Sequence, residues 1–347
     1  MTEADEPIPF LDLARRAAAL EPDLSDAVDR VVRSGHYLLG PELAAFEAEF
    51  ADFAGRRHAV GVASGTEALR LVLVALGLEP GDEVIVPAMT AVPTAAAVCA
   101  AGGVPVFVDV DPETAGIDVA AAATAVTDRT RAVIPVHLYG RPAGLPDLGV
   151  PIIEDAAQAH GALVPTAPSR AATYSFYPTK NLGGIGDGGA VVTDDDALAA
   201  KVRLLRAHGL TDGYVHTEIA TNARMSEIES AGLRVGLRAL AAGTERRREI
   251  ARRYRAAAPA MHWQATHPRH VYHLCVARMA DRDEFRARVP FGTALHYQRA
   301  LTQQPAYQQF VRAPCPEAER WAAECVSLPC FPELTDEEIE AVCRALQ

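Results

Sequence analysis

Lysine is almost missing from this sequence, which carries 31 arginines but only two lysines, Lys180 and Lys201. Arginine can replace lysine on a surface, but its guanidinium stays protonated, whereas a desolvated lysine amine gives up its proton. Lys180 lies among aromatic residues and glycines, in Ser175-Phe-Tyr-Pro-Thr-Lys-Asn-Leu-Gly-Gly. We therefore consider Lys180 a candidate for covalent chemistry with a carbonyl compound. The alternative is an ordinary solvated loop lysine.

Long apolar runs and basic clusters are lacking too. No window approaches 18 uninterrupted apolar residues, and the N-terminus has no basic region followed by an apolar run, so we predict neither a membrane span nor a signal peptide. The formal net charge is −12. The densest basic stretch, residues 246–253, is interleaved with glutamates at helical spacing, which predicts a solvated helix face. These absences favour a cytoplasmic enzyme with no nucleic-acid or membrane partner.

Metal-binding patterns are also missing. The six cysteines form no Cys-x-x-Cys pair, and no His-x₃-His pair lies on a predicted helix beside a carboxylate. Both patterns are typical of zinc sites. The sequence therefore predicts buried free thiols and no metal site.

What is present indicates an α/β fold. Short β-branched runs alternate with Ala- and Leu-rich helical stretches. Continuous apolar strands between helices are typical of a mostly parallel sheet covered on both faces, and ligands gather at the carboxyl ends of such strands. The predicted strands are 58–63, 83–86, 104–108, 132–136, 151–154 and 173–176, and the predicted helices between them include 65–76 and 94–101.

The pattern changes toward the C-terminus. Helices are predicted over 194–207 and 226–258, and the second is long enough to leave the core. A strand at 271–277 and helices at 282–289 and 335–346 then predict a smaller α+β region. We expect a large domain at 1–240 and a small C-terminal domain at 241–347 that begins with a long linking helix. We expect roughly the first 20 residues to pack on the small domain.

Small hydroxyl residues and a glycine follow the first predicted strand. Ser64, Gly65 and Thr66 lie at a strand-to-helix junction, where backbone N–H groups and hydroxyls can bind a phosphate. Ser and Thr are also ordinary helix N-caps, which is the more frequent role. Ser175 adds a third hydroxyl five residues before Lys180. A phosphate anchor and an amine could thus face one crevice.

Asp155 follows the apolar strand 151–154. A carboxylate there needs a cationic partner or hydrogen-bond donors, because burying it alone is costly. One interpretation is a loop or N-cap aspartate. The other is a partner for a protonated pyridine nitrogen, which lets the ring accept electrons from a carbanion. A phosphate cradle, a Schiff-base lysine and a ring-nitrogen aspartate together are what pyridoxal 5′-phosphate (PLP) requires.

Six motifs occur in a specific order along the chain. They are Ser64-Gly-Thr-Glu-Ala-Leu69, Val136-His-Leu-Tyr-Gly140, Glu154-Asp-Ala-Ala-Gln-Ala-His-Gly161, Ser175-Phe-Tyr-Pro-Thr-Lys-Asn-Leu182, Gly186-Asp-Gly-Gly189 and Asn222-Ala-Arg-Met-Ser-Glu227. This set resembles the DegT/DnrJ/EryC1/StrS aminotransferases over almost the whole chain. The resemblance implies a fold-type-I PLP-dependent transferase, similar to aspartate aminotransferase. Such enzymes transfer an amino group from L-glutamate or L-glutamine to a keto-sugar, usually nucleotide-linked, or to a cyclitol, through pyridoxamine phosphate.

The resemblance also implies a role for each matching residue. Lys180 would form the Schiff base and move the proton between the substrate and the cofactor. Asp155 would pair with the pyridine nitrogen, and Gln158 would lie near the phenolic oxygen of the ring. The phosphate would be held by Ser64, Gly65, Thr66 and Ser175.

Three further residues are expected near the site. Asn222 would reach the phosphate from the other subunit of a homodimer, so that the active site is shared and a monomer is inactive. By sequence alone, a helix N-cap is the favoured alternative for Asn222. His160 and His296 are candidate substrate contacts, although a hydrogen-bonded structural histidine is the commoner role.

The sequence departs from the family pattern at three places. Ala91 stands where relatives usually carry an aromatic residue that stacks on the pyridine ring, so stacking is weaker or comes from elsewhere. The stretch between Gly161 and Thr173 is shorter than usual, and Gln298 replaces a proline after His296-Tyr297. All three departures are expected near the acceptor, so they leave its identity open.

Two alternatives to an aminotransferase remain at this point. A sugar dehydratase of the same family, dependent on PLP or pyridoxamine phosphate, would carry histidine in place of Lys180, which argues against it. A non-catalytic regulatory relative would have no need of Lys180, Asp155 and Ser175.

Overall fold

The computed structural model describes residues 7–162 and 168–347 of the chain. At its centre, seven strands follow one another in the order β3-β2-β4-β5-β6-β7-β1. Parallel bridges from Val133 to Ile152 and from Val136 to Asp155 join β4 to β5. The strands are β1 His58–Val62, β2 Glu83–Pro87, β3 Val104–Val108, β4 Thr130–Val133, β5 Ile153–Asp155, β6 Ala171–Ser175 and β7 Gly189–Thr193.

The sheet is mostly parallel, as predicted. Only β7 runs against its neighbours, β6 and β1. The connection from β6 to β7 is a loop without a helix, and it carries Lys180. A short loop between two neighbouring strands makes the second strand run antiparallel to the first. Two parallel neighbours need a longer crossover connection.

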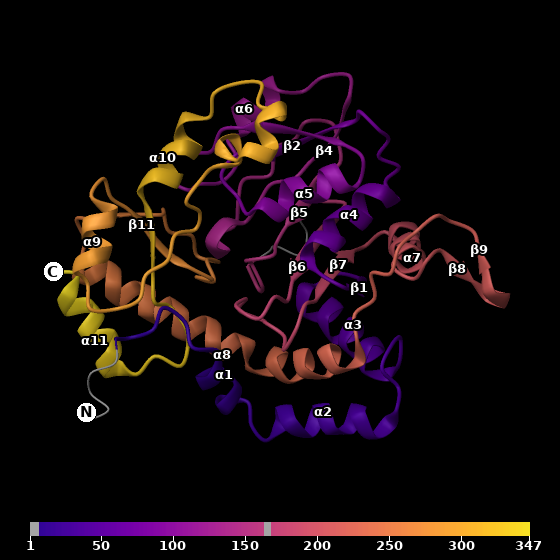
Figure 1. The fold of residues 1–347 in the computed structure, drawn as a ribbon, viewed down its shortest axis with the longest axis horizontal. Helices are drawn as coiled ribbons and strands as arrows, with labels where there is room; N and C mark the ends of the chain where they lie inside the picture. Colours follow the sequence, from indigo (N-terminus) through magenta and orange to yellow (C-terminus); the bar gives the residue numbers. More distant parts are fainter. Residues whose placement is uncertain (1–6, 163–167) are drawn as a thin grey trace.

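Alternate residues of the strands point to opposite faces of the sheet, and both faces are covered. On one face, Val60 and Val191 pack in the cluster that includes Leu69 and Val72 of helix α4. On the other, residues such as Ala59 and Val192 pack against aromatic side chains of α3. The helices around the sheet are α3 Pro41–Ala54, α4 Gly65–Ala75, α5 Val92–Ala100, α6 Val119–Thr124 and α7 Asp196–Leu205 (Figure 1).

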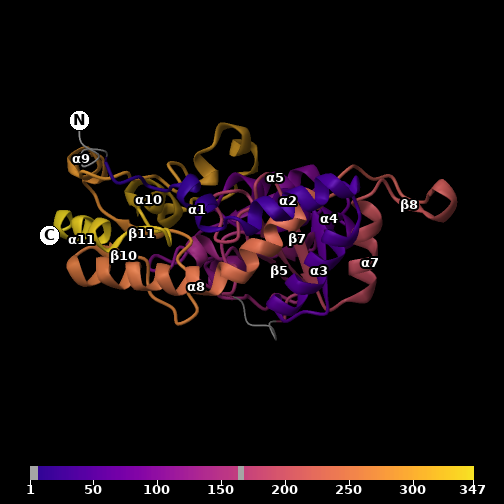
Figure 2. The ribbon, with the colours of Figure 1, turned by 90° about the horizontal axis from the view of Figure 1, so that it is seen from below.

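Helix α8, Glu227–Ala257, runs along one side of the molecule and continues beyond the large sheet (Figure 2). Helix α2, Asp23–Ser34, packs on it, and so does α11, Asp336–Ala345. Because α8 passes residue 240 without a break, the division of the chain at that residue stays a prediction. Among the residues that the structure describes, no helix is both long and apolar enough to cross a membrane.

A second, antiparallel sheet lies near the C-terminus in the order β10-β11-β12. Residue Ile8 forms a bridge with Phe291, next to this region. The strand predicted at 271–277 begins only at Cys275, because the backbone N–H groups of Val271 and Leu274 donate to carbonyls of the loop at Tyr139 and Gly140. The elements are β10 His262–Trp263, β11 Cys275–Arg278, α9 Arg282–Arg288, α10 Pro316–Glu324 and β12 Cys325–Leu328.

The remaining elements are short. Helix α1, Leu13–Ala19, precedes α2, and a hairpin of β8, Leu210–Thr211, and β9, Val215–His216, projects from the body near α7 (Figures 1 and 2). Single 3₁₀ turns occur at Leu138–Gly140, Asp212–Tyr214, Leu301–Gln303 and Pro305–Phe310. All six cysteines are free thiols, and four of them are buried.

Candidate active site

A cavity of about 230 Å³ lies at the carboxyl ends of β1, β2, β5 and β6, and we call it the strand-end cavity. Carboxyl ends of parallel strands meet at one edge of a sheet, so residues far apart in the sequence converge there. Of the residues to which the sequence analysis assigned a role at the cofactor, those that line this cavity are Ser64, Gly65, Thr66, Asp155, Gln158, Ser175 and Lys180.

Lys180 projects into the strand-end cavity from the β6–β7 loop. Its backbone N–H donates to the carbonyl of Tyr177 at 2.8 Å, which closes a tight turn. Burial lowers the pKa of its amine to about 8, because the charged form loses its hydration, while the nearby charge of Asp155 acts in the opposite direction. At pH 7 about one tenth of the amine is therefore uncharged and nucleophilic, far more than for an ordinary lysine.

Asp155 is 5% exposed and lines the same cavity as Lys180, on whose amine its charge acts. The hydroxyl of Thr94 donates to its Oδ2 at 2.8 Å, and the backbone N–H of Ala157 donates to its Oδ1 at 3.1 Å. Burial raises the pKa of the carboxyl, and these two donors partly oppose the shift. The two bonds fix the orientation of the carboxylate, and its remaining lone pairs can still accept a hydrogen bond from a cationic partner.

Thr94 is a functional residue that the sequence reasoning missed. Its hydroxyl also lies 3.1 Å from that of Thr90, which lines the cavity. The available signal was its place in the first turn of the helix that follows strand β2, at the same edge of the sheet as Asp155. Reasoning limited to individual motifs does not reveal a contact between two strand ends.

The start of α4 approaches the end of β6 very closely. A Cβ atom on Gly65 would lie 2.7 Å from Cβ of Ser175, so no side chain fits at residue 65. Ser64 caps the helix, because its Oγ accepts from the N–H of Glu67 at 3.1 Å. The cap leaves the N–H groups of Gly65 and Thr66 at a positive helix end that lines the cavity. The N-cap role and the phosphate-binding role of this segment are compatible.

Gln158 lines the cavity with an amide that is fixed at both ends. Its Oε1 accepts from the backbone N–H of Tyr139 at 2.5 Å, and its Nε2 donates to the hydroxyl of Tyr297 at 2.9 Å. Tyr139 has a φ of 63°, in the left-handed region, so this bond holds a backbone conformation that tyrosine rarely adopts. Gln158 therefore joins the strand-end cavity to the C-terminal part of the chain.

His160 does not line the strand-end cavity, contrary to what a substrate contact would require. It is fully buried between the rings of Tyr174 and Phe176, at centroid distances of 5.3 and 5.8 Å. Burial lowers the pKa of its imidazole to about 3, and the charge of Lys180 contributes. An apolar aromatic cluster encloses the ring on the core side of the loop, so we withdraw His160 as a substrate contact.

His296 lies outside the strand-end cavity as well, but it lines a neighbouring cavity of about 140 Å³ together with Thr179 and His273. Its Nδ1 lies 2.9 Å from the hydroxyl of Ser327, and its ring stacks on Phe10. Burial lowers the pKa of His296 to about 4, and the charge of Lys180 adds to the effect. Its role as a substrate contact stays a prediction.

Asn222 is not a helix N-cap, so that alternative is wrong. Helix α8 begins at Glu227, and Ser226 caps it by accepting from the N–H of Glu229 at 3.1 Å. Asn222 pairs with Ala207 in extended backbone, and its side chain is exposed and accepts from Nε of Arg224. It does not line the strand-end cavity of its own chain.

Of the three departures from the family pattern, one lies in the strand-end cavity. Ala91 lines the strand-end cavity beside Pro93, and among the described lining residues the one aromatic side chain is Tyr177, which is 52% exposed. Gln298 is exposed. The shortened stretch after Gly161 includes residues 163–167, which lie outside the described residues.

Comparisons with known proteins agree with this geometry. The chain is 43% identical to the erythromycin biosynthesis sensory transduction protein EryC1 of Saccharopolyspora erythraea, over 98% of this chain and 99% of that protein. It is 42% identical to the dTDP-3-amino-3,4,6-trideoxy-alpha-D-glucose transaminase of Streptomyces venezuelae, over 94% of this chain and 92% of the other.

Its fold is similar to that of a solved structure of S. venezuelae DesV in complex with a ketimine intermediate. The TM-score is 0.93 at 40% identity, over 98% of this chain and 97% of the other. The family model described as DegT/DnrJ/EryC1/StrS aminotransferase matches residues 19–347. Almost the whole chain therefore carries the sequence and the fold-type-I architecture of these PLP-dependent enzymes, and the protein belongs to the DegT/DnrJ/EryC1/StrS aminotransferase family.

Proposed function

We propose that this protein is a PLP-dependent aminotransferase that moves an amino group from L-glutamate or L-glutamine to a keto-sugar, nucleotide-linked or not, or to a keto-cyclitol. The observation that carries the proposal is the strand-end cavity, in which an amine of lowered pKa faces a buried carboxylate. The S. venezuelae relative is named for a dTDP-linked amino sugar, which supports a nucleotide-linked acceptor.

The residues of the strand-end cavity fit PLP. The start of α4 offers N–H groups and the Thr66 hydroxyl to a phosphate, and Gly65 lets the backbone approach. Asp155, held by Thr94, offers a carboxylate to a ring nitrogen. Ser175 and Lys180 complete the cavity. When bound, PLP supplies a carbonyl group that condenses with amines and a ring that withdraws electrons from the adjacent carbon.

The chain's own residues then have distinct tasks. Nζ of Lys180 would hold the cofactor covalently. Once a donor amine has displaced it, the free amine would take the proton from Cα of the donor and later deliver a proton to the former carbonyl carbon of the acceptor. A pKa of about 8 suits both directions of this transfer near neutral pH. Asp155 would keep a ring nitrogen protonated. Its buried and oriented carboxylate stabilises the positive charge on that nitrogen.

We further propose that two copies of the chain share their active sites. The β8–β9 hairpin projects from the body and exposes apolar side chains, with Tyr214 83% exposed and Val215 53% exposed. Ile219, next along the chain, is fully exposed. Apolar residues on a projecting arm are suited to bury against a second copy. Asn222, which is exposed and is not among the residues that line its own cavity, would then reach the phosphate of the partner.

One spectroscopic experiment tests the assignment. The purified protein should be yellow, and reduction with borohydride should fix the cofactor on a peptide that contains Lys180. Lys180→Ala should abolish the visible absorbance of the Lys180–cofactor bond and the turnover. A colourless protein that PLP cannot reconstitute would overturn the proposal.

The second lysine is a matched control. Lys201 lies on α7, where it pairs with Glu218, and it lines neither the strand-end cavity nor its neighbour. Lys201→Ala should therefore leave the spectrum and the turnover intact. Equal damage from both substitutions would contradict the role of Lys180.

A regulatory function is a second candidate, because the EryC1 relative is named a sensory transduction protein. A regulator would need no transferable amine. Conversion of the bound cofactor to its pyridoxamine form by L-glutamate, measured as loss of visible absorbance, favours the aminotransferase. A protein that binds PLP yet never converts it would favour the regulator.

A further inference from the structure

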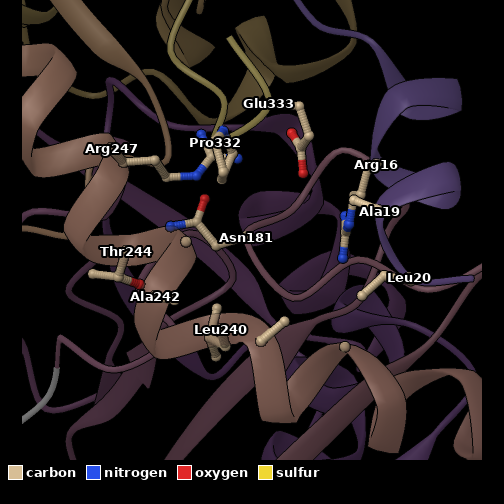
Figure 3. Close-up of a pocket in the computed structure, with 13 residues that line it drawn as sticks. Arg16, Ala19, Leu20, Asn181, Leu240, Ala242, Thr244, Arg247, Pro332 and Glu333 are labelled. Carbon is tan, nitrogen blue, oxygen red and sulfur yellow. The ribbon is translucent and has the colours of Figure 1, made fainter. Parts of the chain in front are cut away.

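A second cavity, of about 340 Å³, lies between α1, α8 and the residues that follow β12 (Figure 3). It shares no lining residue with the strand-end cavity. Figure 3 shows Arg16 and Arg247 on opposite sides of it, with Asn181 between them. Glu333 and Thr244 complete its polar lining. We call it the arginine cavity.

The two arginines of this cavity have no ion-pair partner within residues 7–162 and 168–347. Arg247 was expected on a solvated helix face, yet it is only 6% exposed, because it falls on the same stripe of α8 as Leu240, Ile250 and Tyr254. The hydrogen bonds of both guanidiniums go to backbone carbonyls: Arg16 donates to those of Pro178, Lys180 and Gly183, and Arg247 to those of Tyr272 and Cys330.

Two guanidiniums that share a single nearby carboxylate, that of Glu333, leave an excess of positive charge in the cavity, which is unfavourable. Burial lowers the pKa of Arg16 and of Arg247, and the charge of Arg247 lowers that of Arg16 further. The charge of Glu333 opposes both shifts. The neighbours along the chain are paired with carboxylates: Arg15 with Glu338 at 2.8 Å, and Arg246 with Glu249 at 2.8 Å. A ligand of net negative charge bound in the cavity would balance the positive charge that Glu333 leaves.

The cavity also contains acceptors that need a donor. Asn181 donates through Nδ2 to the carbonyl of Val271 at 3.0 Å, but its Oδ1 is buried without a partner. Oε2 of Glu333 is buried without a partner too. Inorganic phosphate would place two negative charges beside the Glu333 carboxylate, which repels them. It also has too few hydrogen-bond donors to satisfy both acceptors. A ligand with both an anionic group and an ammonium group satisfies the whole set.

We infer that the arginine cavity is a binding site for an acidic α-amino acid, separate from the strand-end cavity. The guanidiniums of Arg16 and Arg247 bind its two carboxylates from opposite sides, and Asn181 Oδ1 and Glu333 accept from its ammonium group. Two guanidiniums and one carboxylate leave one positive charge in the cavity, which the net negative charge of the ligand offsets.

The site is connected to the catalytic loop. Arg16 donates to three carbonyls of this loop. They belong to Pro178, at 3.1 Å, to Lys180 itself, also at 3.1 Å, and to Gly183, at 2.8 Å. A ligand on Arg16 therefore contacts the loop through one side chain. The inference does not depend on the proposed function, since it concerns binding at residues outside the strand-end cavity.

The test is a calorimetric titration of L-glutamate into the borohydride-reduced protein, whose cofactor can no longer exchange with an amino acid. We expect one L-glutamate per chain, and binding weakened at least about tenfold by Arg16→Gln or Arg247→Gln, since each removes a charge-assisted contact. Arg15→Gln, next to Arg16 and paired with Glu338, should bind L-glutamate like the wild type.

Glu333→Gln covers the case in which the arginine variants fail to fold. The wild type should prefer L-glutamate over glutarate, which lacks the ammonium group, and Glu333→Gln should abolish that preference. The inference is overturned if the reduced protein does not bind L-glutamate, binds glutarate equally well, or keeps its preference in Glu333→Gln. If borohydride finds no cofactor to reduce, the proposed function fails, and the same titration still decides the inference.

Discussion

At the scale of single residues, the environment of Lys180 fixes how the protein responds to pH. Burial lowers the pKa of its amine to about 8, so about half of the amine is in the nucleophilic form at pH 8 and about nine tenths at pH 9. The rate at which the apoprotein combines with PLP should therefore rise about tenfold per pH unit below pH 7 and level off above pH 8. Stopped-flow absorbance from pH 6 to pH 10 measures this rate.

The same profile in Lys201→Ala serves as the control, because Lys201 is one-third exposed and ion-paired on α7. A rate that keeps rising to pH 10, as for an ordinary lysine, would show that the Lys180 amine is not desolvated as the structure indicates.

Thr94 allows a second prediction at this scale. Thr94→Val keeps the shape of the side chain but removes the hydroxyl that donates to Asp155. Hydrogen bonds to charged groups contribute roughly 1.5–3 kcal/mol, so the affinity for PLP should fall by about tenfold or more. Equilibrium titration of the apoprotein with PLP measures the change. Thr94→Ser should restore most of the affinity, and equal losses in both variants would mean that the hydroxyl has no role in orienting the carboxylate.

The residues that the sequence did and did not reveal differ in a physical way. Lys180 and Asp155 were predictable because each is chemically conspicuous where it stands, an amine in a chain of arginines and a carboxylate after an apolar strand. Thr94 and Arg247 were not, because their roles depend on contacts between distant segments. Arg247 did carry a signal, since it lies on the apolar stripe of α8, but its charged neighbours obscured it.

At the scale of elements, the glycine-rich loop after Lys180 packs against the first turn of α8 through Glu229. A Cβ atom on Gly184 would lie 1.3 Å from Oε1 of Glu229, so the carboxylate occupies the space of the missing side chain. Oε1 is buried without a partner. Burial raises the pKa of Glu229 to about 7, bonds from the N–H groups of Gly186 and Ile185 oppose the shift, and the charge of Asp187 adds to it.

A raised pKa makes the charged form of Glu229 a cost to folding. The folded state prefers the protonated carboxyl, so this contribution to stability is present near pH 5 and is lost as the pH rises through about 7. Glu229→Gln should therefore raise the melting temperature by a few degrees at pH 8, from a gain of about 2 kcal/mol, and by little at pH 5. Thermal unfolding at both pH values measures the difference.

Glu245→Gln is the control on the same helix, because Glu245 is exposed and pairs with Arg248. It should change the melting temperature slightly and equally at both pH values. If Glu229→Gln also gave the same shift at pH 5 and pH 8, the Glu229 carboxyl would not titrate between them.

Most elements were predictable from periodicity, but their ends depend on tertiary hydrogen bonds. Residues 271–274 read as strand from their composition, yet the loop at Tyr139 and Gly140 takes the N–H groups of Val271 and Leu274. Similarly, β4 ends at Val133 instead of 136, because the chain beyond it pairs with β5 through isolated bridges. Local propensity decides where a strand can form, and its neighbours decide how far it extends.

At the scale of the whole molecule, the position of Asn222 separates two arrangements of the active site. If the site lay within one chain, Asn222 would take no part in the strand-end cavity, whose lining does not include it. If two copies share their sites, the segment that carries Asn222 and the exposed β8–β9 hairpin would complete the partner's phosphate site. Sequence could not settle this, because no local pattern encodes a contact with a second copy.

Mixing two defective variants distinguishes the arrangements. Lys180→Ala lacks the amine, and Asn222→Ala should lose most activity at limiting cofactor. When equal amounts exchange subunits, half of the dimers should contain one chain of each kind, and in these one site combines an intact Lys180 with the partner's intact Asn222. Activity should therefore recover to about one quarter of the wild-type value. Mixing Asn222→Ala with itself controls for reactivation during exchange. Recovery no greater than the sum of the separate variants would exclude a shared site, because each chain would then keep its own defect.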